Sequence, residues 1–427
     1  MRSPRAAWDG LAARPLRAAA ALSVLAALAV AWALAAHALW RSTVPAALHL
    51  PHVGARGLFS PSFLRSSASF ERFLEIDALL ADVTLLVVLG LYARRGHRLM
   101  RESAAGRIGT GMMLGMLGFA VLWLAEIPFG LAAVWWQRRH GISHQGYVAS
   151  LGESFFSLGA KFLFVSLALL IAMALAGVLA RWWWALAAPA FAGLALLSAF
   201  LSVYLIPNTH PLRDARTAAE VRQLARIERV PGTHADVQDV DRDTTAPNAE
   251  SVGFGSTRRV ILWNTLLDGR FPRGEVRVVV AHELGHIAHR HILKRVGWLV
   301  LFLLPAAALV ALFTRPRGGL ARAEAVPVAL FVFVVLQLLA LPLNNVVSRR
   351  QEAEADWSAL QATRDPADAR SLFRDLAKAS LADPDPPAWS YVLFEDHPTI
   401  VQRIAMVDAW QARAGRVAPA FAPAPAR

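Results

Sequence analysis

The chain has 427 residues, of which 56% are hydrophobic and only 18% carry a charge. This balance indicates a membrane protein, because a water-soluble core does not need long stretches that are almost free of charge. The absence of cysteine excludes disulfides, thiolate metal ligands and cysteine nucleophiles. The formal net charge is +13, but no basic run is interleaved with aromatic residues, so we expect no nucleic-acid partner.

Candidate membrane spans are the first predicted elements. A helix needs ~20 mostly apolar residues to cross the hydrocarbon layer. The second candidate is the weakest, because it is short and contains Asp82. The first follows four arginines, and a cleavable signal peptide is its alternative interpretation, although it is longer than a usual signal core. The seven candidates are residues 18–40, 78–93, 111–136, 155–180, 182–206, 296–313 and 325–347.

Three charged residues fall inside these spans, namely Asp82, Glu126 and Lys161. Such groups are costly where they face lipid, and most of them face a bundle interior or a wet cavity. One interpretation is therefore a hydrophilic chamber between the helices. The alternative is that Asp82 and Lys161 lie near the membrane surface and reach water from there.

Two polar segments flank the last pair of spans. In chain order we expect an N-terminal membrane domain (1–206), a first polar segment (207–295), a membrane hairpin (296–347), a second polar segment (348–416) and a disordered tail (417–427). Within the polar segments, the pattern predicts helices at 212–228, from about 274, and at 348–364, 367–382 and 398–414, with one strand at 258–263.

The sequence His282-Glu283-Leu284-Gly285-His286 ends the first polar segment. On a helix, His282 and His286 share one face, where two imidazoles can bind one zinc ion at ~2.0–2.1 Å. Glu283 projects beside the metal and can take the proton of an attacking water, then pass it to the leaving amine. The bare motif arises by chance in unrelated helices, but its place on a predicted helix after an apolar run favours a zinc peptidase.

The third metal ligand must come from elsewhere in the chain. Ile292 stands where the extended metzincin pattern has histidine, which excludes that subclass. Glu352 follows the last span, and a membrane hairpin would return it to the two histidines. Asp356 lies one turn further on and can accept a hydrogen bond from a ligand histidine. We interpret His289 and His291 as interfacial or supporting residues. A solvated, charged helix face is the alternative for the segment around Glu352.

With these residues the chain resembles the membrane-embedded M48 zinc metallopeptidases, the Ste24-type CAAX prenyl proteases. In that family HExxH precedes a helical hairpin and SRxxExxxD follows it, as residues 348–356 do here. The pair Asn248-Ala249, the predicted strand, and Asp396-His397-Pro398 with Arg403 also resemble family blocks. The resemblance is specific over residues 241–407 and rests on hydropathy alone over the first five spans.

The resemblance implies one Zn²⁺ per chain, bound by His282, His286 and Glu352, with Glu283 as the general base. It also implies that Asp356 and Arg403 support this site from behind the ligands.

Substrate contacts are implied in the same way. Asn248 and His397 would contact the substrate or stabilise the oxyanion. The strand at 258–263 would be a sheet edge that pairs with extended substrate. The residues expected to make this pairing are Arg259, Val260 and Ile261. Three departures from the family, Glu250, Asn264 and Ala353, leave the substrate preference open.

The sequence gives conflicting signals for the membrane orientation. The N-terminal arginines favour a cytoplasmic N-terminus, which with seven spans puts both polar segments outside. The arginine-rich stretch before the sixth span argues the reverse, and the resemblance implies a site that faces the cytoplasm. The Ala/Arg-rich composition indicates a bacterial cell membrane. The expected partners are the lipid bilayer and a peptide or protein substrate, including membrane-associated or lipidated ones, and the sequence does not set the oligomeric state.

Together these features predict an all-α integral membrane protein with about seven transmembrane helices and a gluzincin-like metalloprotease domain that carries a small β element. The expected activity is zinc-dependent hydrolysis of peptide bonds. One alternative is an HtpX-like protease of membrane-protein quality control, although that relative usually has about four spans. Another is a non-catalytic zinc-binding membrane protein or a transporter. Glu283 discriminates between these classes, because a scaffold needs no base beside its metal.

Overall fold

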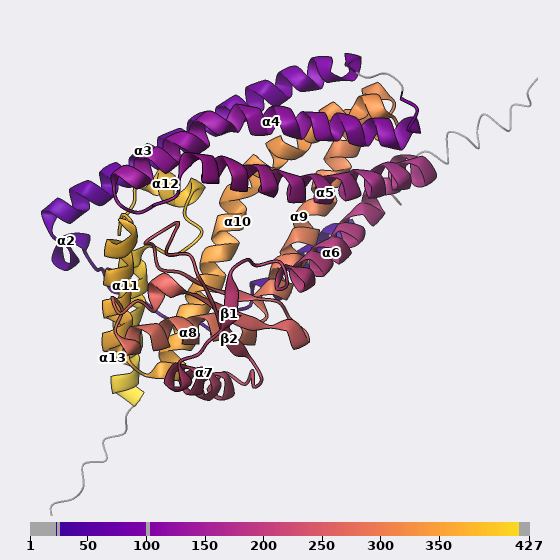
Figure 1. Ribbon diagram of the computed structural model, residues 1–427. Helices are drawn as coiled ribbons and strands as arrows, with labels where there is room; N and C mark the ends of the chain where they lie inside the picture. Colours follow the sequence, from indigo (N-terminus) through magenta and orange to yellow (C-terminus); the bar gives the residue numbers. More distant parts are fainter. Residues whose placement is uncertain (1–22, 24–25, 100–102, 418–427) are drawn as a thin grey trace, which may run out of the picture.

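Long apolar helices form one part of the molecule (Figure 1). The computed structural model describes residue 23 and residues 26–99 and 103–417, and within this part six helices are long and apolar enough to cross a membrane. An apolar helix at Ala26–Trp40 is shorter, and the rest of the first predicted span lies outside the described residues. The six helices are α3 (Pro61–Arg95), α4 (Gly106–Arg139), α5 (Tyr147–Leu179), α6 (Trp183–Ser202), α9 (His291–Thr314) and α10 (Val326–Thr363).

Helix α3 is much longer than the span predicted at 78–93. It begins at Pro61, whose fixed φ suits the first helical position. The Ser60 hydroxyl accepts a hydrogen bond from the Phe63 backbone amide at 3.2 Å and so caps the helix. A short helix, α2 (Ala55–Leu58), precedes it. Hydropathy revealed only the apolar half of α3, because its first turns carry charged and hydroxyl side chains.

The last two spans form the predicted hairpin. Helix α10 is 38 residues long, so the span at 325–347 and the helix at 348–364 are one continuous element. It ends at Arg364, whose φ of 52° is left-handed and stops the helical hydrogen bonding. The polar half of α10 therefore projects rigidly beyond its apolar half, on the side where α9 begins.

A small sheet belongs to the first polar segment. Its four strands have the order β1-β2-β4-β3. Strands β2 and β4 are parallel, and the other two pairs are antiparallel, with Ala249 opposite Leu262 in the β3–β4 pair. The strands are β1 (Thr209–Pro211), β2 (His234–Gln238), β3 (Ala249–Val252) and β4 (Arg259–Trp263).

The sheet order corrects one prediction. The strand predicted at 258–263 exists as β4, but it lies between β2 and β3, so both of its edges are hydrogen-bonded. It is therefore not a sheet edge, and its residues Arg259, Val260 and Ile261 cannot pair with a substrate. Strands β1, β2 and β3 escaped prediction because they are only three to five residues long and mostly polar. In β2 the buried Ala235 and Val237 do alternate with polar residues, but two apolar residues are a weak signal.

Five further helices complete the polar part of the chain. Their core includes Leu262 on β4 and two fully buried leucines, Leu284 and Leu360. All predicted helices of this part are present, and one short helix was not predicted. The tail predicted at 417–427 lies outside the described residues, apart from Val417. The helices are α7 (Ala215–Ile227), α8 (Arg273–Ala288), α11 (Pro366–Ser380), α12 (Ala388–Leu393) and α13 (Ile400–Val417).

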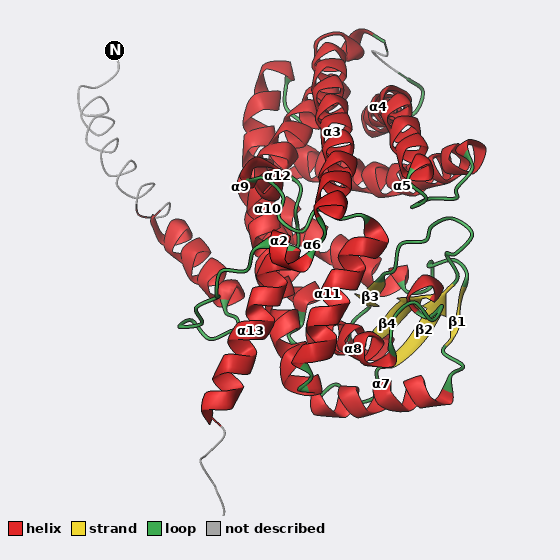
Figure 2. Cartoon of the chain, turned by 90° about the vertical axis from the view of Figure 1, so that its left-hand side faces the viewer, coloured by secondary structure: helices red, strands yellow, loops and turns green. Residues whose placement is uncertain are grey.

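The two parts are joined by the hairpin. Figures 1 and 2 show the sheet with α7, α8, α11 and α13 at one end of the molecule and α3 and α4 at the other. Helix α10 runs from one part into the other and packs extensively on α8. This contact between α8 and α10 is where the polar side chains of the two predicted motifs meet.

Candidate metal centre

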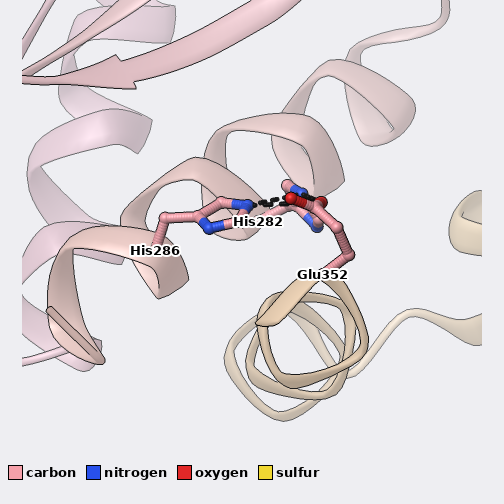
Figure 3. A group of neighbouring side chains, drawn as sticks. All are labelled: His282, His286 and Glu352. Carbon is pink, nitrogen blue, oxygen red and sulfur yellow. Dashed lines mark hydrogen bonds and ion pairs between the residues drawn. The ribbon is translucent and has the colours of Figure 1, made fainter. Parts of the chain in front are cut away.

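Three predicted ligands converge between α8 and α10. Figure 3 shows His282 and His286 projecting from α8 toward Glu352, which lies on α10. The Nε2 atoms of the two histidines are 3.1 Å apart. Glu352 Oε2 lies 3.1 Å from His282 Nε2 and 3.4 Å from His286 Nε2. All three side chains are buried, so the cluster is largely withdrawn from water.

A glycine allows α8 and α10 to approach this closely. A Cβ atom on Gly285 would lie 3.1 Å from the Ser358 Cβ and 3.3 Å from the Ala355 Cα. Such contacts are too tight, so a side chain here would push the helices apart. Ala355 is itself small and fully buried at the same crossing. The small residues of the two motifs therefore set the depth at which Glu352 meets the histidines.

The predicted support for His282 is present. Its Nδ1 donates a hydrogen bond to Asp356 Oδ1 at 2.9 Å. Arg403 holds Asp356 with two hydrogen bonds of 2.6 and 2.8 Å and stacks its guanidinium 4.2 Å from the Phe373 ring centre. Because the proton of His282 sits on Nδ1, the Nε2 lone pair faces the cluster.

The support for His286 is a second chain of residues, of which the sequence predicted only His291, as an interfacial or supporting residue. The His286 Nδ1 lies 2.8 Å from the His291 Nδ1, and the His291 Nε2 lies 3.0 Å from Glu354. A carboxylate only accepts, so His291 donates through Nε2 and accepts through Nδ1. His286 must then donate through Nδ1, which leaves its own Nε2 lone pair facing Glu352.

Glu354 anchors this second chain to the rest of the molecule. It accepts a hydrogen bond from the Lys294 ammonium at 2.8 Å and one from the Thr43 backbone amide at 2.6 Å. The side chain of Arg350 holds the same N-terminal segment, through the Trp40 carbonyl at 2.7 Å and through its ring. In the sequence, the only indication of this role was that Glu354 stands two residues after Glu352 in the same charged run.

The three donors fit a zinc ion. Two ligands at ~2.0–2.1 Å from one ion in a tetrahedral site lie roughly 3.3 Å apart, close to the separations between these atoms. Each histidine directs its proton outward, so three lone-pair donors face one another. Burial lowers the pKa of His282, but its hydrogen bonds to Asp356 and Glu352 outweigh this and raise the pKa to about 10. The cluster is thus arranged to hold positive charge.

Glu283 lies beside the cluster on α8. Its side chain is buried, and within the described part of the chain its carboxylate makes no hydrogen bond or ion pair, so its oxygens are available to a water or substrate. Strand β3 packs against α8. Partial burial raises the pKa of Glu250 on β3, and the nearby charge of Glu283 raises it further.

The two predicted substrate contacts differ in their placement. His397 reaches the centre, with Nε2 3.3 Å from Glu352 Oε2 and Nδ1 2.6 Å from Asp396. Burial lowers the pKa of His397, but the hydrogen bonds to Asp396 and Glu352 raise it to about 9. Asn248 lies just before β3 with an exposed side chain, and its carbonyl accepts a hydrogen bond from the Trp263 amide at 3.0 Å. The structure therefore brings His397, but not the Asn248 side chain, into contact with the ligand set.

An HExxH helix and a carboxylate from a second helix thus meet in one buried cluster, an arrangement that suits a metal ion. Residues 211–411 match the family model "Peptidase family M48". The matched range contains all of the predicted site residues.

Curated relatives carry the same kind of name. The uncharacterized metalloprotease YhfN of Bacillus subtilis (strain 168) is 28% identical over 237 residues, which cover 52% of this chain and 55% of YhfN. A protease HtpX homolog of Acidiphilium cryptum (strain JF-5) is 28% identical over 48% of this chain and 78% of its own length. CAAX prenyl protease 1 homolog of Arabidopsis thaliana is 27% identical over 213 residues, which cover 46% of this chain and 48% of that protein. The chain spans about half the length of YhfN and of the Arabidopsis protein.

The fold itself is similar to a solved structure. The crystal structure of S. mikatae Ste24p superposes with a TM-score of 0.71 over 89% of this chain and 96% of that chain, at 16% sequence identity. At this identity the likeness shows the fold alone. It extends over most of the N-terminal membrane helices, where the sequence offered only hydropathy.

Proposed function

We propose that this protein is a membrane zinc endopeptidase, with one zinc ion bound by His282, His286 and Glu352. A zinc ion held there supplies an electrophilic centre that polarises the peptide carbonyl and acidifies water. Glu283 takes the proton of the attacking water and returns it to the leaving amine. The observation that carries the proposal is the convergence of three lone-pair donors, each histidine oriented by its own partner, next to a carboxylate without a partner among the described residues.

The substrate lies along β3 in this proposal. Strand β3 pairs with β4 on one side, and no other described strand pairs with its outer edge. An extended peptide added there is held by main-chain hydrogen bonds directly beside α8. Asn248 at the start of β3 then contacts the peptide backbone, and His397 donates a hydrogen bond to the developing oxyanion. The raised pKa of His397 keeps it a donor at neutral pH.

The first test is metal content and peptide hydrolysis by detergent-purified full-length protein, with wild type beside Glu283→Gln. We expect about one zinc per chain in both and a loss of activity in Glu283→Gln of ~10²–10⁴-fold or more. Zinc in both without hydrolysis of any unstructured or prenylated peptide would favour a zinc-binding scaffold. Protein that takes up no zinc under any loading condition would refute the proposal.

The topology is part of the proposal. The helix ending at Trp40 is taken as a seventh span, and the metal centre is taken to face the cytoplasm, as the family resemblance implies. The chain has no cysteine, so single cysteines can report exposure without background. Arg216→Cys on α7 should be protected from a membrane-impermeant maleimide in intact cells and labelled in inverted vesicles. Labelling in intact cells would reverse the orientation.

A quality-control protease is the second candidate. Several relatives are named HtpX homologs and align over 44–48% of this chain. The two candidates differ in substrate, which would be lipidated C-terminal peptides in one case and damaged membrane proteins in the other. Competition between a prenylated peptide and an unfolded membrane protein, measured with the same preparation, separates them.

A further inference from the structure

A pocket of about 420 Å³ adjoins the metal centre. One wall is the end of α8, including the proposed ligand His286. The pocket is also lined by Ser251 on β3 and by Gly253, Phe254 and Gly255, which follow it. Val230 and Leu293 add apolar surface to the lining. A peptide that pairs with β3 therefore passes over this pocket immediately beside the metal.

Three arginines line the pocket, namely Arg229, Arg258 and Arg290. The guanidinium of Arg258 is fixed by the Thr233 hydroxyl at 3.1 Å and by a backbone carbonyl. Arg229 and Arg290 are exposed, and neither forms an ion pair with a described residue. Glu228, the carboxylate next to Arg229 in sequence, is directed away and accepts the Ser358 hydroxyl at 2.8 Å. Among the described residues, the lining of the pocket is therefore cationic and contains no carboxylate.

The two exposed arginines occupy an unusual backbone conformation. Arg229 follows the end of α7 with a φ of 59°, and Arg290 follows the end of α8 with a φ of 54°. Glycine or asparagine is the usual residue in the left-handed position after a helix. Arg364 ends α10 in the same conformation outside the pocket, so the conformation alone does not mark a site. What distinguishes Arg229 and Arg290 is that both line one pocket.

The pocket opens where the membrane helices begin. Phe254 in its wall meets Phe200 of α6 edge to face, with ring centres 6.0 Å apart. Leu293 lies in the first turn of α9. A substrate side chain that enters here has apolar surface for its methylene groups and arginines for its charge.

We propose that this pocket is a specificity subsite that binds an acidic side chain of the substrate. This inference rests on the proposed peptidase function. Arginine presents a planar fork that matches a carboxylate, and three such groups beside apolar surface suit glutamate. The subsite lies on the side of the cleaved bond that runs toward residues 251–255. A glutamine of the same shape lacks the charge and binds more weakly.

The test uses quenched-fluorescence peptides in which one glutamate is moved through the positions on both sides of the cleaved bond, each paired with its glutamine analogue. Full-length wild type, Arg229→Gln, Arg290→Gln and Arg290→Glu are compared. Arg213→Gln is the matched control, because Arg213 is also exposed and lies outside the pocket. Labelled peptides are also bound to each form in a Glu283→Gln background, which measures the subsite without hydrolysis.

We expect one position at which wild type prefers glutamate by about tenfold in kcat/KM, carried by KM because the contact is remote from the reacting atoms. Each arginine-to-glutamine change should reduce this preference about fivefold. Arg290→Glu should favour lysine at the same position, a reversal that a folding defect does not produce. Arg213→Gln should behave as wild type.

Two results would overturn the subsite while leaving the peptidase intact. One is hydrolysis without a glutamate preference at any position. The other is an unchanged preference in the arginine variants together with weaker binding to anionic vesicles, which would make the arginines lipid contacts. If no peptide is hydrolysed but the binding preference persists, the subsite stands and the peptidase function fails. If no form binds glutamate peptides over glutamine peptides, the subsite is refuted.

Discussion

The membrane part, which contains the six long apolar helices, and the metal-centre part, which contains the sheet and the helices of the polar segments, bury opposite kinds of side chain. In α4 and α6, only 11% of the most apolar stretch is buried within the molecule, and residues such as Leu124 and Leu197 point outward. In the metal-centre part, Leu262 and Leu284 are fully buried, and charged groups are buried with them. The membrane part is apolar outside because its solvent is hydrocarbon. The metal-centre part can be polar inside because its buried histidines and carboxylates are hydrogen-bonded to one another.

The difference lies in what fixes each side chain. An apolar side chain on α4 keeps its environment if the helix turns or slides slightly. The same movement would change the environment of His282 and His286, because each depends on one hydrogen-bond partner for its tautomer. We therefore expect conservative changes in the metal centre to have larger effects than drastic changes on the membrane surface.

Loss of a ligand should give the largest effect. His286→Ala should reduce bound zinc to a small fraction of one per chain and abolish hydrolysis, because two remaining donors cannot complete the site. His289→Ala is the matched control, since His289 lies at the end of the same helix and makes only long contacts among the described residues, to Ser358 at 3.4 Å and to Glu354 at 3.6 Å. Metal analysis of both proteins checks this, and equal zinc loss in both would show that the helix end, not the ligand, matters.

Loss of a supporting carboxylate should give the next largest effect. Asp356→Asn removes the charge that holds the His282 proton on Nδ1, and we expect zinc affinity to fall ~10–100-fold. Asp375→Asn is the control, because Asp375 pairs only with Lys378 on the same helix. Chelator competition measures both affinities. Unchanged affinity in Asp356→Asn would mean that packing alone orients His282.

Truncation of an apolar side chain should lower the thermal stability more in the metal-centre part than in the membrane part. Leu262→Ala opens a cavity in the metal-centre core and should lower Tm by about 5–15 °C. Leu91→Ala on α3 removes a side chain that is 50% exposed and should change Tm by a few degrees at most. Thermal unfolding in detergent compares them. Similar shifts would mean that the membrane part packs as tightly as the core.

Loss of the Glu354 anchor should give the smallest effect. Glu354→Gln removes the negative charge that pairs with Lys294 but keeps one oxygen that can accept from Thr43 or His291, so zinc affinity should fall only a few-fold. Protease accessibility of the segment around Thr43 should increase. Glu324→Gln, which alters an outlying pair with Arg322, is the control and should change neither measurement. A loss as large as that of Asp356→Asn would make the two supports equivalent.

Local patterns accounted for most of the centre. The spacing of His282 and His286 depends only on helix geometry, and Glu352 followed from the length of the hairpin between the motifs. The resemblance added His397 and Arg403, both of which contact the predicted cluster or its support. The apolar runs located the six described spans, although the start of α3 at Pro61 was missed because its first turns are polar.

What the amino-acid order determined by itself was therefore the ligand spacing, the membrane character and the set of metal-binding donors. The tertiary structure alone decided that β3, not β4, carries the free sheet edge, because strand order depends on pairing between distant segments. It also decided that His286 is supported through His291 and Glu354, which are 63 residues apart in the chain. Those contacts form only when α8, α9 and α10 pack together, so no local periodicity encodes them.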